Sequence, residues 1–175
     1  MNRRGFVGAG GRVLVGLVLG APARGVWRSR DALEIRMRSD VRGERVWFDP
    51  VGVLVDPGTT IRWVVEANVH TATAYHPANG DRPRRIPAGA KPWDSGYLVN
   101  PGDAFEVTLA VPGVYDYYCL PHEQAGMVGR IVVGQPPFGE GALPADAPRI
   151  PEAALKNLPA LDRILRERVV RALFP

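Results

Sequence analysis

The stretch from residue 113 to residue 133 decides the fold, and it reads Gly113-Val-Tyr-Asp-Tyr-Tyr-Cys119-Leu-Pro-His122-Glu-Gln-Ala-Gly-Met127-Val-Gly-Arg-Ile-Val-Val133. Aromatic and β-branched residues fill both of its ends, which indicates two strands. The segment between them carries a thiol, an imidazole and a thioether, at Cys119, His122 and Met127. We therefore expect a loop between the last two strands that holds three metal-binding side chains.

Short strands separated by turns continue this pattern toward the N-terminus. Leu33, Ile35 and Met37 alternate with charged residues, as expected of a strand with one buried face. Turns are indicated where Pro and Gly occur together, as at residues 56–59, 100–103 and 111–113. The remaining candidate strands are 46–48, 51–55, 60–65, 69–75, 105–109, 114–119 and 128–133. This arrangement predicts an all-β domain, specifically a β-sandwich.

The composition excludes several classes of protein. The 175 residues include 20 Gly and 17 Pro, which favours strands and turns over a helical bundle. A single Cys excludes an internal disulfide, a Cys-rich zinc site and an iron–sulfur cluster. Three of the 22 basic residues lie in the first 23 positions, where there is no acidic residue. The other 19 face 18 acidic residues, so the net charge beyond residue 23 is +1 and nucleic-acid binding is not expected.

Residues 1–23 have the features of an export signal. Arg3 and Arg4, with Phe6 shortly after them, resemble a twin-arginine signal, and an apolar run covers residues 13–19. Ala21-Pro-Ala23 is a small-residue site of the kind that signal peptidase cleaves. The alternative is an uncleaved anchor, but the run is shorter than the roughly 20 residues that span a bilayer. We expect residues 24–175 to work in the periplasm or elsewhere outside the cytoplasm, without stable membrane insertion.

Residues 76–96 form a predicted long loop with four prolines and no strand pattern. Its cations outnumber its acidic residues. Two interpretations stay open, a solvated charged loop and a basic docking patch for a partner. The cations in question are Arg82, Arg84, Arg85 and Lys91.

The composition changes again after residue 134, so we expect a domain over residues 24–134 and an extension over 135–175. Residues 135–151 are rich in Pro, Gly and Ala and predict a linker. Residues 152–157 predict a short helix, and a second helix is expected from Pro159 onward. The second helix has an apolar stripe that packs on the sandwich or binds a partner or membrane surface. The stripe consists of Leu161, Ile164, Leu165, Val169, Ala172 and Leu173.

His70 is a fourth candidate metal ligand, beside the three in the 119–127 loop. It follows an apolar strand about fifty residues before Cys119. A thiolate, two imidazoles and a thioether are the ligand set of a blue copper site. Cu(I) favours sulfur and Cu(II) favours nitrogen, and a His2Cys plane with a long axial Met suits both. The sequence therefore predicts one redox-active copper held by His70, Cys119, His122 and Met127.

Residues 32–134 resemble the cupredoxins, in particular the plastocyanin and pseudoazurin group, in the 113–133 segment and its Cys-x2-His-x4-Met spacing. The resemblance implies a Greek-key sandwich, one type 1 copper, and a monomer that carries single electrons between redox partner proteins. It also favours His70 over His76 as the first imidazole ligand. The sequence departs from the family at Thr71, where Asn is usual. In the family, that Asn helps to tie the two ligand loops together by hydrogen bonds.

Two other functions are alternatives to electron transfer. A copper chaperone or buffer would bind Cu(I) and pass it on, but such proteins more often use exposed Met-rich or His-rich stretches. Multicopper enzymes need more than the three His present here, and a binuclear copper centre needs two Cys. We therefore expect that the protein is not an enzyme.

Overall fold

The computed structural model describes residues 32–135 and 149–172. The proposed export signal and residues 136–148 of the predicted linker lie outside the described residues. The elements run, in chain order, β1 Leu33–Ser39, β2 Val46–Asp49, β3 Gly52–Val55, β4 Thr59–Val65, β5 Thr73–Ala74, β6 Ala104–Leu109, β7 Gly113–Tyr118, the 3-10 helix η1 Leu120–Ala125, β8 Val128–Val133, α1 Glu152–Asn157, α2 Leu161–Glu167 and β9 Val169–Val170.

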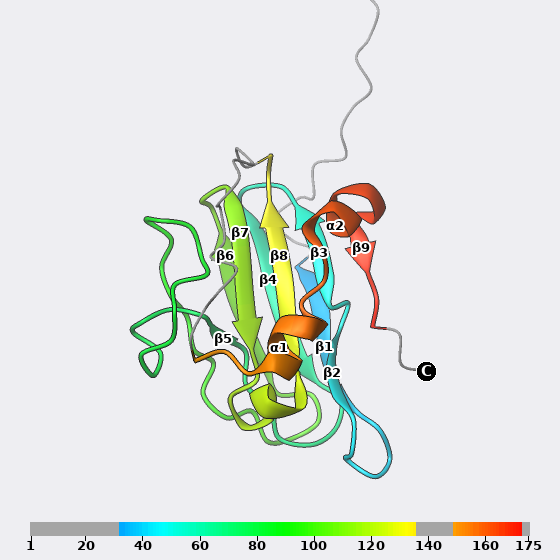
Figure 1. The fold of residues 1–175 in the computed structure, drawn as a ribbon. Coiled ribbons are helices and arrows are strands. Elements are labelled where there is room, and N and C mark those ends of the chain that lie inside the picture. Colours follow the sequence, from blue (N-terminus) through cyan, green and yellow to red (C-terminus); the bar gives the residue numbers. More distant parts are fainter. Residues whose placement is uncertain (1–31, 136–148, 173–175) are drawn as a thin grey trace, which may run out of the picture.

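The strands form two sheets that pack face to face (Figure 1). One sheet has the order β2-β1-β4-β6 and the other has the order β5-β7-β8-β3-β9. The chain crosses repeatedly from one sheet to the other, so β1 and β4 pair in parallel, as do β3 and β8. The predicted all-β sandwich is confirmed.

The core lies between the two sheets and follows from the alternation of the strands. In β4, Ile61, Trp63 and Val65 are buried while the residues between them are partly exposed. In β1, Ile35 and Met37 face the same interior. Full burial of a large apolar side chain contributes about 1.5–3 kcal/mol. The two inner faces therefore supply the main apolar stabilisation of the domain.

All twelve residues of strands β7 and β8 are buried, so both faces of these strands are covered. The C-terminal segment covers their outer faces, and Figure 1 shows α1 lying across the lower part of this sheet. Ala154 of α1 packs with Tyr118 and Val128, while Ile164 of α2 packs with Val132. The segment therefore docks on the sandwich. None of the helices in the described ranges is long and apolar enough to cross a membrane.

The end of the second helix was predicted wrongly. The apolar stripe suggested a helix that continues to Leu173, but α2 ends at Glu167, and Arg168 has a φ of 62°. Val169 and Val170 instead form β9, which pairs with β3. β-Branched residues favour strands, and the edge of β3 offers unpaired backbone groups, so sheet pairing outcompetes the helix here. Similarly, only Thr73–Ala74 of the predicted 69–75 strand belongs to a sheet.

The 76–96 loop is a loop as predicted, but its cations do not all face solvent. Arg85 is buried, and its Nε donates to Asp116 over 2.7 Å. Arg130 of β8 binds the same carboxylate through two nitrogens and donates to the Pro159 carbonyl oxygen over 2.9 Å. Arg82 is paired with Glu123. These contacts contradict a docking patch built from all four cations, because two of them hold internal carboxylates.

We expect Asp116→Asn to destabilise the protein by about 3–5 kcal/mol, because it leaves two buried guanidinium groups without the carboxylate that neutralises them. Chemical denaturation would measure the change. Glu106→Gln is the matched control, since its partner Arg62 is 41% exposed and such a pair contributes less than about 1 kcal/mol. Equal effects of the two substitutions would contradict this account of the buried network.

Candidate metal centre

The candidate ligands gather at one end of the sandwich, where strands of both sheets end. His70 lies beyond β4 and forms an isolated bridge with Leu98. Cys119 directly follows β7, His122 lies in η1, and Met127 directly precedes β8. The structure brings His70, Cys119 and His122 together, with one ligand atom from each lying within 4.8 Å of the others.

The distances within this group suit a single metal ion. The sulfur of Cys119 lies 3.6 Å from Nδ1 of His70 and 3.3 Å from Nδ1 of His122. With the bond lengths of zinc sites, about 2.0 Å to nitrogen and about 2.3 Å to sulfur, a trigonal centre separates these atoms by about 3.7 Å. The observed separations are close to that value, so the three donor atoms fit around one ion.

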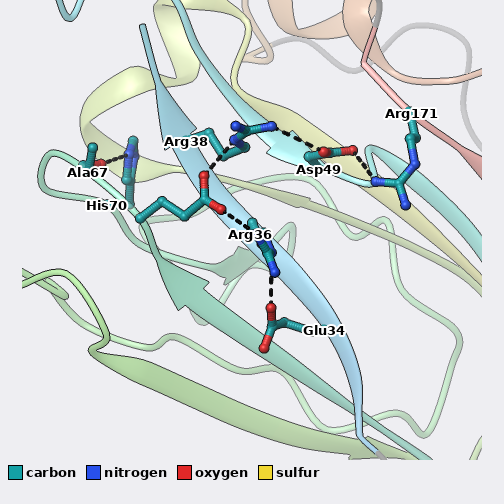
Figure 2. Close-up of polar contacts among 8 residues, drawn as sticks. Glu34, Arg36, Arg38, Asp49, Ala67, His70 and Arg171 are labelled. Atoms are coloured by element: carbon teal, nitrogen blue, oxygen red, sulfur yellow. Dashed lines mark hydrogen bonds and ion pairs between the residues drawn. The ribbon is translucent and has the colours of Figure 1, made fainter. Parts of the chain in front are cut away.

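A backbone carbonyl orients the ring of His70. Nε2 of His70 lies 2.9 Å from the carbonyl oxygen of Ala67, an interaction drawn in Figure 2. A carbonyl only accepts, so Nε2 carries the proton and Nδ1 keeps its lone pair, directed toward the Cys119 sulfur. The tautomer that a metal ligand requires is therefore imposed by the protein.

The residue before Ala67 is Glu66, and it belongs to a row of ion pairs across the outer face of β1 (Figure 2). Half-exposed pairs such as these contribute little individually, but a connected row restrains its members together. The row joins the start of the ligand-bearing loop to the C-terminal segment. Its members in order are Glu34, Arg36, Glu66, Arg38, Asp49 and Arg171.

Thr71 connects the two ligand-bearing segments. Its amide donates to the Cys119 sulfur over 3.3 Å, and its hydroxyl oxygen accepts from the Leu120 amide over 2.8 Å. The Thr71 hydroxyl also lies 3.0 Å from that of Thr73. The threonine that replaces the family's usual Asn therefore still ties the loops together, through its hydroxyl group.

Met127 and His76 occupy different surroundings. Met127 is fully buried in the core, and its amide donates to the His122 carbonyl over 3.1 Å while its own carbonyl accepts from Cys119. These bonds close the loop between β7 and β8 and hold the backbone of Met127 next to that of Cys119 and His122. His76 lies outside the group, and its Nδ1 accepts from the Ala78 amide over 3.1 Å.

The protonation states of the three donors follow from their burial. Burial, together with the neighbouring His122, lowers the pKa of His70 to about 4. Burial also lowers the pKa of His122 below its ordinary value. Both imidazoles are therefore neutral at pH 7. Burial raises the pKa of the Cys119 thiol to about 11, so the metal-free protein carries a protonated thiol.

Sequence reasoning missed three groups that shape the site. The Ala67 carbonyl and the Thr71 amide are backbone groups, which have no signature in the side-chain pattern. Glu123 was also missed, although it lies inside the ligand loop. It is 2% exposed, accepts from the Tyr75 hydroxyl over 2.9 Å and pairs with Arg82. The only sequence signal for Glu123 was its position, since it is a carboxylate between the predicted ligands His122 and Met127.

Comparison with known proteins identifies relatives of this fold and site. Residues 35–134 match the family of copper-binding proteins described as the plastocyanin/azurin family. Plastocyanin from Fritillaria agrestis is 31% identical over 120 residues, which cover 68% of this chain and 71% of that protein. Plastocyanin from Hordeum vulgare is 60% identical over 37 residues, but the match spans 21% of this chain and 24% of that protein.

A solved structure of pseudoazurin from Sinorhizobium meliloti is similar over a larger part of the chain. Its TM-score is 0.56 at 26% sequence identity, and the similarity covers 78% of this chain and 94% of the pseudoazurin. The shared fold therefore extends over most of both proteins.

We expect binding of one Cu(II) ion at pH 7 to release about one proton, because the bound thiolate loses the proton that its raised pKa retains. The imidazoles release none, since their pKa values are lowered. Copper affinity should therefore fall as the pH decreases. Calorimetry in two buffers of different ionisation enthalpy would count the protons. Release of none would mean that Cys119 is already a thiolate or is not a ligand.

Proposed function

Because this chain belongs to the plastocyanin/azurin family of copper-binding proteins, we propose that it is a single-electron carrier with one type 1 copper, held by His70, Cys119, His122 and Met127. The observation that carries the proposal is the group of three donor atoms within 4.8 Å. The tautomer imposed on His70 and the burial of His70 and Cys119 prepare the group for a metal. A copper ion bound there supplies the Cu(I)/Cu(II) couple.

Each ligand has a separate task in this proposal. Neutral His70 and His122 provide nitrogen donors, Cys119 provides the thiolate, and Met127 provides the weak axial thioether. Hydrogen bonds from Thr71 and to Ala67 hold the Cys119 sulfur and the first imidazole in place without the metal. Because the donor atoms are already restrained, they move little when the copper changes between Cu(I) and Cu(II). This small rearrangement favours rapid electron transfer.

Exposure at the site suggests where electrons enter and leave. His122 is half-buried while His70 and Cys119 are fully buried. Leu120, between two of the ligands, is 46% exposed at the same end of the sandwich. We propose that redox partner proteins, acting as donor and acceptor, approach at this end because the path from the His122 ring to the surface is short.

We propose that the protein works outside the cytoplasm. Support comes from the twin-arginine-like features of residues 1–23 and the small-residue site that ends at Ala23. In this proposal residues 24–134 form the copper domain and residues 135–175 form its extension.

The visible spectrum with one equivalent of Cu(II) tests the function directly. We expect an intense blue band that disappears on reduction with ascorbate, and Cys119→Ala should abolish it because the band requires thiolate ligation. His76→Ala is the matched control and should leave the band unchanged. A colourless protein that binds Cu(I) tightly would instead support a copper chaperone or buffer.

Substitution of the axial residue tests the role of Met127. We expect Met127→Leu to retain copper and the blue colour but to raise the reduction potential, because loss of the thioether favours Cu(I). Voltammetry of the two proteins would measure the difference. An unchanged potential would contradict an axial role for Met127.

A further inference from the structure

The ligand loop is held from outside at Glu123, the residue directly after His122. Its carboxylate is buried, which is costly unless the group is hydrogen-bonded and paired. Both requirements are met by residues outside the loop. Tyr75, directly after β5, donates its hydroxyl proton over 2.9 Å, and Arg82 supplies the countercharge. Arg82 also donates to the Arg149 carbonyl oxygen of the C-terminal segment.

A second contact holds the loop at Gly126, the residue directly before Met127. Nδ2 of Asn157, at the end of α1, donates to the Gly126 carbonyl oxygen over 3.0 Å. Gly126 has a φ of 81°, and a Cβ atom there would lie 2.4 Å from Asn157 Nδ2. The absence of a side chain at Gly126 therefore lets the amide approach. Asn157 lies outside residues 35–134, which match the family.

The two contacts restrain the chain between the proposed ligands His122 and Met127. Four residues separate these ligands, and Glu123 and Gly126 are the first and last of the four. The Gly126 amide donates to the Glu123 carbonyl, so the two held points are also bonded to each other over 2.9 Å. The axial thioether is the weakest ligand of such a centre. The protein fold therefore determines the distance from this sulfur to the copper more than the copper–sulfur bond does.

We propose that Tyr75 and Asn157 are positioning residues for the copper centre: they hold Glu123 and Gly126 and thereby fix the distance from the Met127 sulfur to the metal. The inference rests on the proposed function and extends it to residues that bind no metal. The C-terminal segment then contributes to the electronic properties of the site as well as to the fold.

Tyr75→Phe and Asn157→Asp, made in the full chain and loaded with Cu(II), test the proposal. The first removes a hydroxyl group, and the second removes the amide donor while keeping the shape of the side chain. We expect both to change the ratio of the visible absorption bands and the electron paramagnetic resonance parameters, and to shift the reduction potential. In the metal-free proteins, we expect the Gly126 and Met127 amides to exchange at least about tenfold faster than in the unmodified chain.

Two controls separate positioning from general destabilisation. Tyr115→Phe also removes a hydroxyl from a buried tyrosine, one that donates to the Val111 carbonyl over 2.6 Å, away from the ligand loop. Ile164→Ala weakens the packing of α2 without touching the loop. We expect both controls to lower the unfolding midpoint while leaving the spectrum, the potential and the exchange of the two loop amides unchanged.

The outcomes distinguish this inference from the function on which it rests. Folded variants with the spectrum, potential and exchange rates of the unmodified chain would overturn the positioning role and leave the electron-carrier function intact. Absence of a blue band in the unmodified chain would overturn both. Asn157 is exposed on α1, so its substitution spares the core and gives a decisive result even if Tyr75→Phe does not fold.

Discussion

The hydrogen bond from the Thr71 amide to the Cys119 sulfur joins the two chain segments that carry the candidate ligands. Thr71 lies between β4 of one sheet and β5 of the other, and Cys119 follows β7, the strand that pairs with β5. His70 is the neighbour of Thr71, so this bond also restrains the spacing between two candidate donors. The geometry of the metal centre is therefore a property of the packed sandwich.

The C-terminal segment is a second condition for this arrangement. It buries the outer faces of β7 and β8, which carry the ligand loop between them. Its Pro159 carbonyl accepts from Arg130, and Arg130 binds the buried Asp116 in β7. The segment thus contacts the strands, the buried charges and the loop. A segment outside residues 35–134 is therefore part of the structure around the site.

The sequence predicted best those features that depend on local periodicity or spacing. Ile35 and Met37, and Ile61 and Trp63, alternate with solvated residues, so their strands were evident. The spacing of Cys119 and His122 predicted two donors that the structure places together. Val169 and Val170 were assigned to the second helix because the apolar residues there follow helical spacing. The sequence alone does not show that β3 is available to pair with them. The pairing of Asp116 with Arg85, 31 residues away, depends on the tertiary fold and leaves no periodic trace.

Strand β9 is two residues long and covers the edge of β3 at Gly52 and Val53. An uncovered edge presents a row of free amides and carbonyls on which another copy of the chain can add a strand, and repeated addition leads to aggregates. A diffusing carrier has to remain a separate particle at the concentrations at which it meets its partners. By covering this edge, the short β9 limits such pairing and helps the protein to stay dispersed in solution.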